Sequence, residues 1–206
     1  RQRYAKKWPR ACTGAANAWL VMCGPSPGRA DRSDDIWPGG PNRPVDEKPT
    51  IGPGAGKIEF DTNTRRNDAF MKLATTCFQG SRYNANALTA LVNLDWGHNP
   101  KAAEINHEYL KAGCSVVFDI MRECRPRVVL TMAGAGGVTW LRLSNYLQDH
   151  SKGSVAADCD NMIIELDDCP FSTLVVSTTL HPSHPMKESL LAALETTVGT
   201  FRELHD

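Results

Sequence analysis

The sequence predicts a single α/β domain built on a mostly parallel sheet. Four short apolar runs of strand length, at residues 19–23, 87–94, 127–132 and 171–179, alternate with segments of helical periodicity. Such alternation is typical of a parallel sheet covered by helices on both faces. A length of 206 residues suits one domain of this kind, spanning residues 1–206. We therefore expect a three-layer α/β/α sandwich with a short, mostly parallel four-stranded central sheet.

The segments between the strands supply the helices of this prediction. The apolar spacing predicts helices at residues 64–78, 100–124, 137–147 and 187–204. The basic segment 1–18 is expected to form a short helix against the body of the domain. The polar segment 150–169 is expected to cross the surface and to contain a short strand at residues 162–166.

Composition and charge exclude several classes of protein. Hydrophobic content is 41% and charged content 22%, which predicts a soluble globular chain, and no apolar run is long enough to span a membrane. The net charge is zero, so binding of nucleic acid through a broad positive field is not supported. The seven cysteines include no close pair, which favours free buried thiols, a cytoplasmic location and the absence of a metal site.

One long segment has no periodicity. Residues 29–56 are rich in proline and glycine and follow the first predicted strand directly. Loops of this length in a compact domain are usually functional or disordered. We expect a lid or pocket wall here, with Asp31 and Trp37 among its chemically interesting members.

Polar or glycine-rich turns follow all four predicted strands. They are Gly24-Pro25-Ser26-Pro27-Gly28, the end of the second strand at Asn93, the small-residue turn Gly134-Ala135-Gly136-Gly137, and His181-Pro182-Ser183. Because the carboxyl ends of parallel strands share one edge of the sheet, these turns are expected to converge on one site. Asn93 itself has two open interpretations: it satisfies neighbouring backbone, or it recognises a ligand.

In these motifs the chain resembles the uracil-DNA glycosylase superfamily. The resemblance covers residues 19–204 and rests on a first strand ending in Gly-x-x-Pro-Gly, a middle strand ending in Asn, and a last strand ending in His-Pro-Ser. It implies an enzyme that flips a nucleotide out of DNA and hydrolyses its N-glycosidic bond without a cofactor or metal. It further implies a monomer that binds DNA.

The resemblance also assigns roles to individual residues. His181 would donate to the base oxygen, and Asn93 would read the pyrimidine edge within a pocket formed with Gly24 and Pro25. Trp37, with Phe60 behind it, would stack on the base. The expected DNA contacts are Pro182, Ser183, Pro185, Met186, Lys187, Gly134, Ala135 and Gly136.

Three positions modify this expectation. Ser26 stands where the family usually has Asp or Asn to position water, so Asp31 is expected to take over that role or else is a solvated loop carboxylate. Gly28 leaves space beside C5 of the pyrimidine, so the pocket is expected to admit a base larger than uracil, such as a 5-substituted cytosine or uracil. The resemblance thus implies excision of uracil or of a modified pyrimidine, in DNA repair or in defence against phage. Two alternatives stay open: a non-catalytic nucleic-acid or nucleotide-binding relative, and a hydrolase using Ser183 as nucleophile, which lacks the glycine-flanked elbow such a serine needs.

Overall fold

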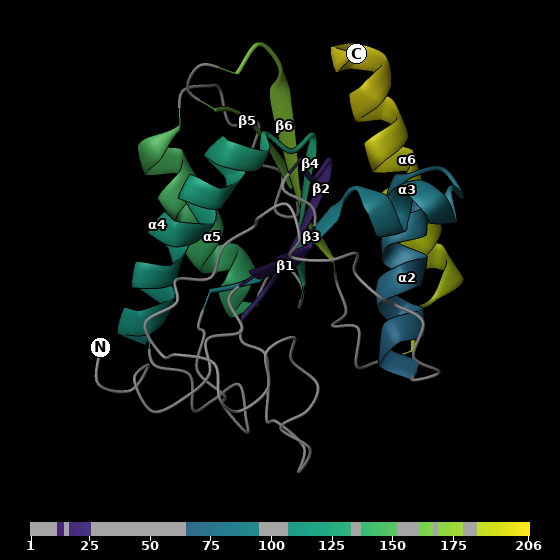
Figure 1. Cartoon of the computed structure of the whole chain (residues 1–206), viewed down its shortest axis with the longest axis horizontal. Coiled ribbons are helices and arrows are strands. Elements are labelled where there is room, and N and C mark those ends of the chain that lie inside the picture. The colour runs from purple at the N-terminus through teal and green to yellow at the C-terminus, as the bar shows by residue number, and fades with distance from the viewer. Residues whose placement is uncertain are drawn as a thin grey trace.

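The structure is a computed structural model that describes residues 12–14, 17–25, 65–94, 107–132, 137–151, 161–166, 169–178 and 185–206. A six-stranded sheet lies between two layers of helices in this part of the chain (Figure 1). The predicted three-layer α/β/α architecture is therefore confirmed.

The four predicted strands form the centre of the sheet. They are β2 (Leu20–Gly24), β3 (Thr89–Asn93), β4 (Val128–Met132) and β6 (Ser172–Thr178). All pair in parallel, in the spatial order β3-β2-β4-β6. Every residue of β2 and β4 is buried. Burial on both faces explains why these strands read as continuous apolar runs rather than as an alternating pattern.

The predicted number of strands was wrong, because each edge of the sheet carries an additional antiparallel strand. β1 (Cys12–Gly14) pairs with β3, and β5 (Asn161–Glu165) pairs with β6. β5 confirms the short strand expected near residues 162–166. β1 lies in a segment for which a helix was expected. A three-residue strand has too few residues to show an alternating pattern, and its position is decided by pairing with β3.

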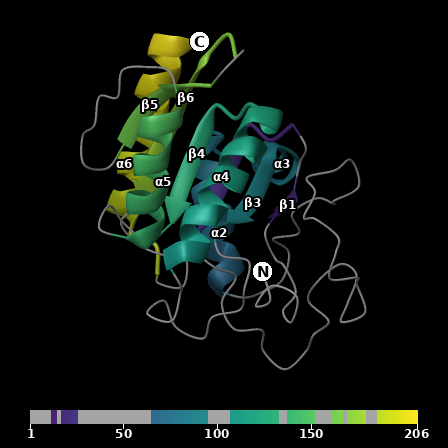
Figure 2. The same cartoon turned by 90° about the vertical axis from the view of Figure 1, so that its left-hand side faces the viewer.

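The helices divide between the two faces of the sheet. α2 (Arg65–Cys77), α3 (Arg82–Ala87) and α6 (Glu188–His205) cover one face. α4 (His107–Cys124) and α5 (Val138–His150) lie side by side over the other (Figure 2). The sequence did not predict α3. The hydroxyl of Ser81 accepts a hydrogen bond from the Asn84 amide and caps this short helix, which moves the start of β3 to Thr89.

Two apolar cores result, one on each face. Val21, Val92 and Val129 point toward α4 and α5, whereas Leu20, Met22 and Leu130 point toward α2 and α6. Residues adjacent along one strand thus enter opposite cores, as the pleat of a strand requires.

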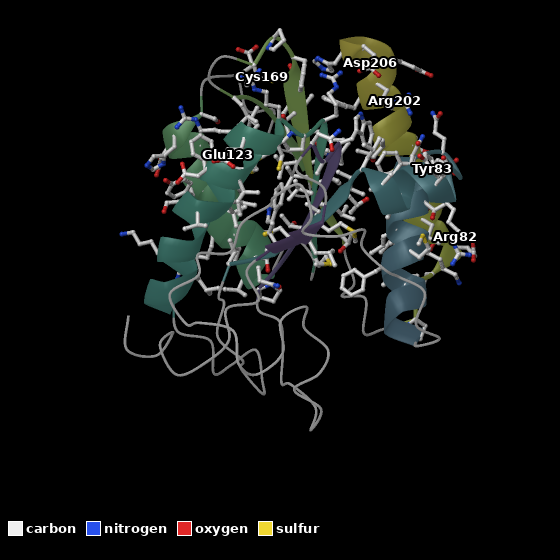
Figure 3. All side chains as sticks on the ribbon, viewed as in Figure 1. Arg82, Tyr83, Glu123, Cys169, Arg202 and Asp206 are labelled. Atoms are coloured by element: carbon white, nitrogen blue, oxygen red, sulfur yellow. The ribbon has the colours of Figure 1, made fainter. Side chains whose placement is uncertain are left out.

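Arg127, which lies at the amino ends of the parallel strands, connects the sheet to the end of α6. It is 8% exposed, and it donates hydrogen bonds to the carbonyl oxygens of Ser172, at 2.9 Å, and His205, at 2.8 Å. It also forms an ion pair with Asp206, which lies close to Arg202 at this end of α6 (Figure 3). Its guanidinium stacks on the rings of Phe171 and Phe201. Although burial opposes the change, the hydrogen bond and charge of Arg127 lower the pKa of Asp206.

Five cysteines whose side chains the structure describes are free thiols, as predicted. Cys23, Cys77, Cys114 and Cys124 are buried, and Cys169 is half-buried. Burial raises the pKa of Cys77 to about 12 and those of Cys114 and Cys124 to about 11. These three thiols are packing groups and not nucleophiles. Each helix in the described residues is too short or too polar to cross a membrane.

Candidate functional site at the carboxyl edge of the sheet

The carboxyl ends of the four parallel strands are neighbours in space, as the sequence predicts. Gly24, the last residue of β2, is in register with Asn93, the last residue of β3. Met132, the last residue of β4, is in register with Thr178, the last residue of β6. The turns that carry the predicted chemistry therefore all leave from one edge of the sheet.

Gly24 and Asn93 are in close contact at this edge. A Cβ atom at position 24 would lie 2.8 Å from Oδ1 of Asn93 and 3.2 Å from Cε of Met132. The amide of Asn93 thus lies across the neighbouring strand, in the space that a side chain on Gly24 would occupy. Asn93 is half-buried and engaged in interactions. Of the predicted base-binding residues, the structure brings these two together.

Helix α4 fixes the end of β3 on which Asn93 lies. Gly113, in the first half of α4, packs directly on the backbone of Leu94, the residue after Asn93. A Cβ at Gly113 would lie 2.6 Å from the carbonyl carbon and 2.9 Å from Cα of Leu94, and nearer still to the carbonyl oxygen. The amide of Leu94 in turn donates a hydrogen bond to the Gly24 carbonyl oxygen, at 3.0 Å. The end of β3 is therefore held from both sides.

Hydroxyl groups are concentrated near the same edge on β4 and β6. Thr178 donates a hydrogen bond to the Thr131 carbonyl oxygen at 3.2 Å, and Thr131 donates to the Val176 carbonyl oxygen at 3.5 Å. The hydroxyl of Ser177 is buried and has no hydrogen-bond partner among the described residues. Ser177 was not among the predicted site residues, because a serine within a strand gives no signal of whether its hydroxyl is paired.

The first turn of α5 reaches this edge directly after β4. Its N-cap is Gly137, which has extended backbone angles and no side chain to cap the helix. The free amides of a helix's first turn carry partial positive charge and favour an anion. Thr139, in the same turn, is fully buried, and its hydroxyl finds no hydrogen-bond partner in the part of the chain that the structure describes.

The segment before α6 contains three of the predicted DNA contacts. Pro185 and Lys187 are exposed, and Lys187 is the N-cap of α6. Met186 is half-buried and packs against the core that contains Met132. Pro25, which follows Gly24, is half-buried.

The remaining predicted site residues lie outside the described residues. They are Ser26, Gly28, Asp31, Trp37, Phe60, Gly134, Ala135, Gly136, His181, Pro182 and Ser183, together with the expected lid at residues 29–56. Within the residues that are described, no group of histidine, cysteine and acidic side chains could hold a metal ion.

A comparison of the sequence with models of known protein families finds no match, and a search of curated proteins also finds no match.

Proposed function

We propose that this chain is a DNA glycosylase that flips a uracil or a modified, 5-substituted pyrimidine out of DNA and hydrolyses its N-glycosidic bond. The proposal rests on the position of the Asn93 amide, which lies over Gly24 at the carboxyl edge of the parallel sheet. An amide offers both a donor and an acceptor, which is what recognition of a pyrimidine edge requires. The order of motifs along the chain supports the same class of enzyme.

The chemistry assigns a role to each candidate residue. The base departs as an anion, so a donor at its oxygen stabilises the transition state, and His181 is the proposed donor. The sugar becomes an oxocarbenium-like cation that water attacks, and Asp31 or Ser26 would position that water. Uncapped amides at the start of α5 would bind a backbone phosphate. Nucleotide flipping costs a few kcal/mol, which stacking and phosphate contacts offset.

The test is a panel of oligonucleotides, each with one uracil, hypoxanthine, 5-hydroxymethyluracil, 5-hydroxymethylcytosine or glucosylated 5-hydroxymethylcytosine. Abasic sites are detected by alkaline cleavage. We expect cleavage of at least one pyrimidine substrate, with loss of cleavage but retained DNA binding in His181→Ala and Asp31→Ala. Thr196→Ala, on the exposed side of α6, serves as a surface control that leaves cleavage unchanged. Absence of cleavage across the whole panel would overturn the proposal.

The second candidate function is a non-catalytic nucleic-acid or nucleotide-binding relative of the same fold. Ser26 favours it, because a hydroxyl is a poor base, and so does the zero net charge. Binding of the same oligonucleotides with no abasic product would establish this alternative. A monomeric state and a cytoplasmic location belong to the proposal as well, and size-exclusion chromatography with light scattering tests the first.

A further inference from the structure

The space above Gly24 is filled from both neighbouring strands. Asn93 reaches it from β3 and Met132 reaches it from β4, so that Oδ1 and Cε lie 2.8 Å and 3.2 Å from one point, the position of a Cβ on residue 24. Real Cβ atoms do not approach other heavy atoms within 3.0 Å. Any side chain at position 24 would therefore displace the Asn93 amide.

The backbone gives no other reason for glycine at this position. Gly24 has no positive φ angle, in contrast to Gly80, whose φ is 87°. It lies inside a strand, where glycine has no conformational advantage over alanine. Glycine at position 24 therefore serves to leave room for the Asn93 amide.

Met132 fills part of the same space above Gly24. Met132 is 4% exposed and packs in the core beneath this edge, and its methyl group lies next to Gly24. A methionine side chain is unbranched and adapts its shape to its neighbours. The Asn93 amide thus lies against the rigid backbone of Gly24, in a space that it shares with the adaptable Met132 side chain.

We propose that Gly24 and Met132 are positioning residues that hold the Asn93 amide in the orientation that selects the base. This inference rests on the proposed glycosylase function. A carboxamide presents an oxygen acceptor on one side and an NH₂ donor on the other, so a rotated amide reverses its hydrogen-bonding pattern. Uracil presents an acceptor at position 4 whereas cytosine presents a donor, so the orientation of the amide decides between them.

The experiment measures kcat/KM for matched uracil and cytosine oligonucleotides, and for their 5-hydroxymethyl forms, in four variants. Gly24→Ala is paired with Gly199→Ala in α6, where an added Cβ meets no described residue within 4 Å. Met132→Leu is paired with Met22→Leu, a fully buried methionine deeper in the same core. Thermal unfolding of each variant verifies that it is folded.

We define selectivity as kcat/KM for the preferred pyrimidine divided by kcat/KM for the other pyrimidine of the pair. We expect Gly24→Ala to lower this ratio by roughly 10- to 100-fold, because one polar group of the base would be mispaired. Met132→Leu should shift the same ratio by a smaller factor, and both controls should leave it unchanged. A folded Gly24→Ala variant with the wild-type ratio overturns this inference while the glycosylase function stands. A wild-type protein that cleaves no substrate overturns both.

Discussion

Replacement of Gly113 by alanine should destabilise the protein, although alanine is the better helix former. The added Cβ would lie 2.6 Å from the carbonyl carbon of Leu94 and nearer still to its oxygen, whereas ordinary contacts begin at 3.4 Å, so α4 must withdraw by more than about 0.8 Å. Backbone atoms cannot rotate away, so we assign about 3 kcal/mol to the overpacking and subtract about 1 kcal/mol for the gain in helix propensity. The net loss, about 2 kcal/mol, lowers Tm by roughly 4–8 °C in a chain of this size.

Differential scanning calorimetry of Gly113→Ala beside Gly199→Ala tests this reasoning. Gly199 is also inside a helix, but a Cβ there meets no atom of the described residues within 4 Å, so the same substitution should raise the stability by about 0.5–1 kcal/mol. The two variants therefore move Tm in opposite directions. Equal or higher Tm in Gly113→Ala than in the wild type would refute the close packing of α4 on the end of β3.

Three further outcomes follow from the buried polar groups and thiols. Asp206→Asn should lower the urea midpoint at pH 7, and this loss should shrink as the pH falls below 4. The folded-state pKa of Asp206 is lowered, so its ion pair with Arg127 stabilises the fold above pH 4 and is lost as the pH falls through that lowered value. A loss that stays constant with falling pH would contradict this. Thr89→Val should raise the stability by about 1 kcal/mol in urea titrations, since the buried Thr89 hydroxyl has no hydrogen-bond partner within the described ranges, and a lower stability would show that the hydroxyl is paired. Cys77 should resist iodoacetamide at pH 8 in the native protein and react after denaturation, because burial raises its pKa to about 12. Peptide mass spectrometry measures the modification, and modification of Cys77 in the native protein would count against the packing of α2.

Strand and helix positions were largely predictable because their signals are local. Of the four central strands, β2 and β4 are buried along their whole length, and β3 and β6 are mostly buried. Helices α2, α5 and α6 have apolar positions at helical spacing. β1 and α3 escaped prediction for one shared reason. Each is too short to show a period, so its structure depends on partners elsewhere, namely β3 for β1 and the Ser81 cap together with α2 for α3.

The candidate site was predictable in part for a similar reason. The sequence places a polar or glycine-rich turn after every central strand, and the shared direction of parallel strands brings those ends together. The predictions for His181, Asp31 and the segment 29–56 remain predictions, because these residues lie outside the described part of the chain.

By itself the sequence determined the fold class, the four central strands and the edge of the sheet where polar groups gather. The tertiary structure decided which residues meet at that edge. Gly24 and Asn93 are 69 positions apart in the sequence, and only the register between β2 and β3 places the Asn93 amide over Gly24, where no side chain is present. Gly113 shows the same dependence, since its need for glycine arises from the Leu94 backbone packed against it. Periodicity along a chain reports which face of an element is buried, whereas atomic contact between elements depends on register and packing distance.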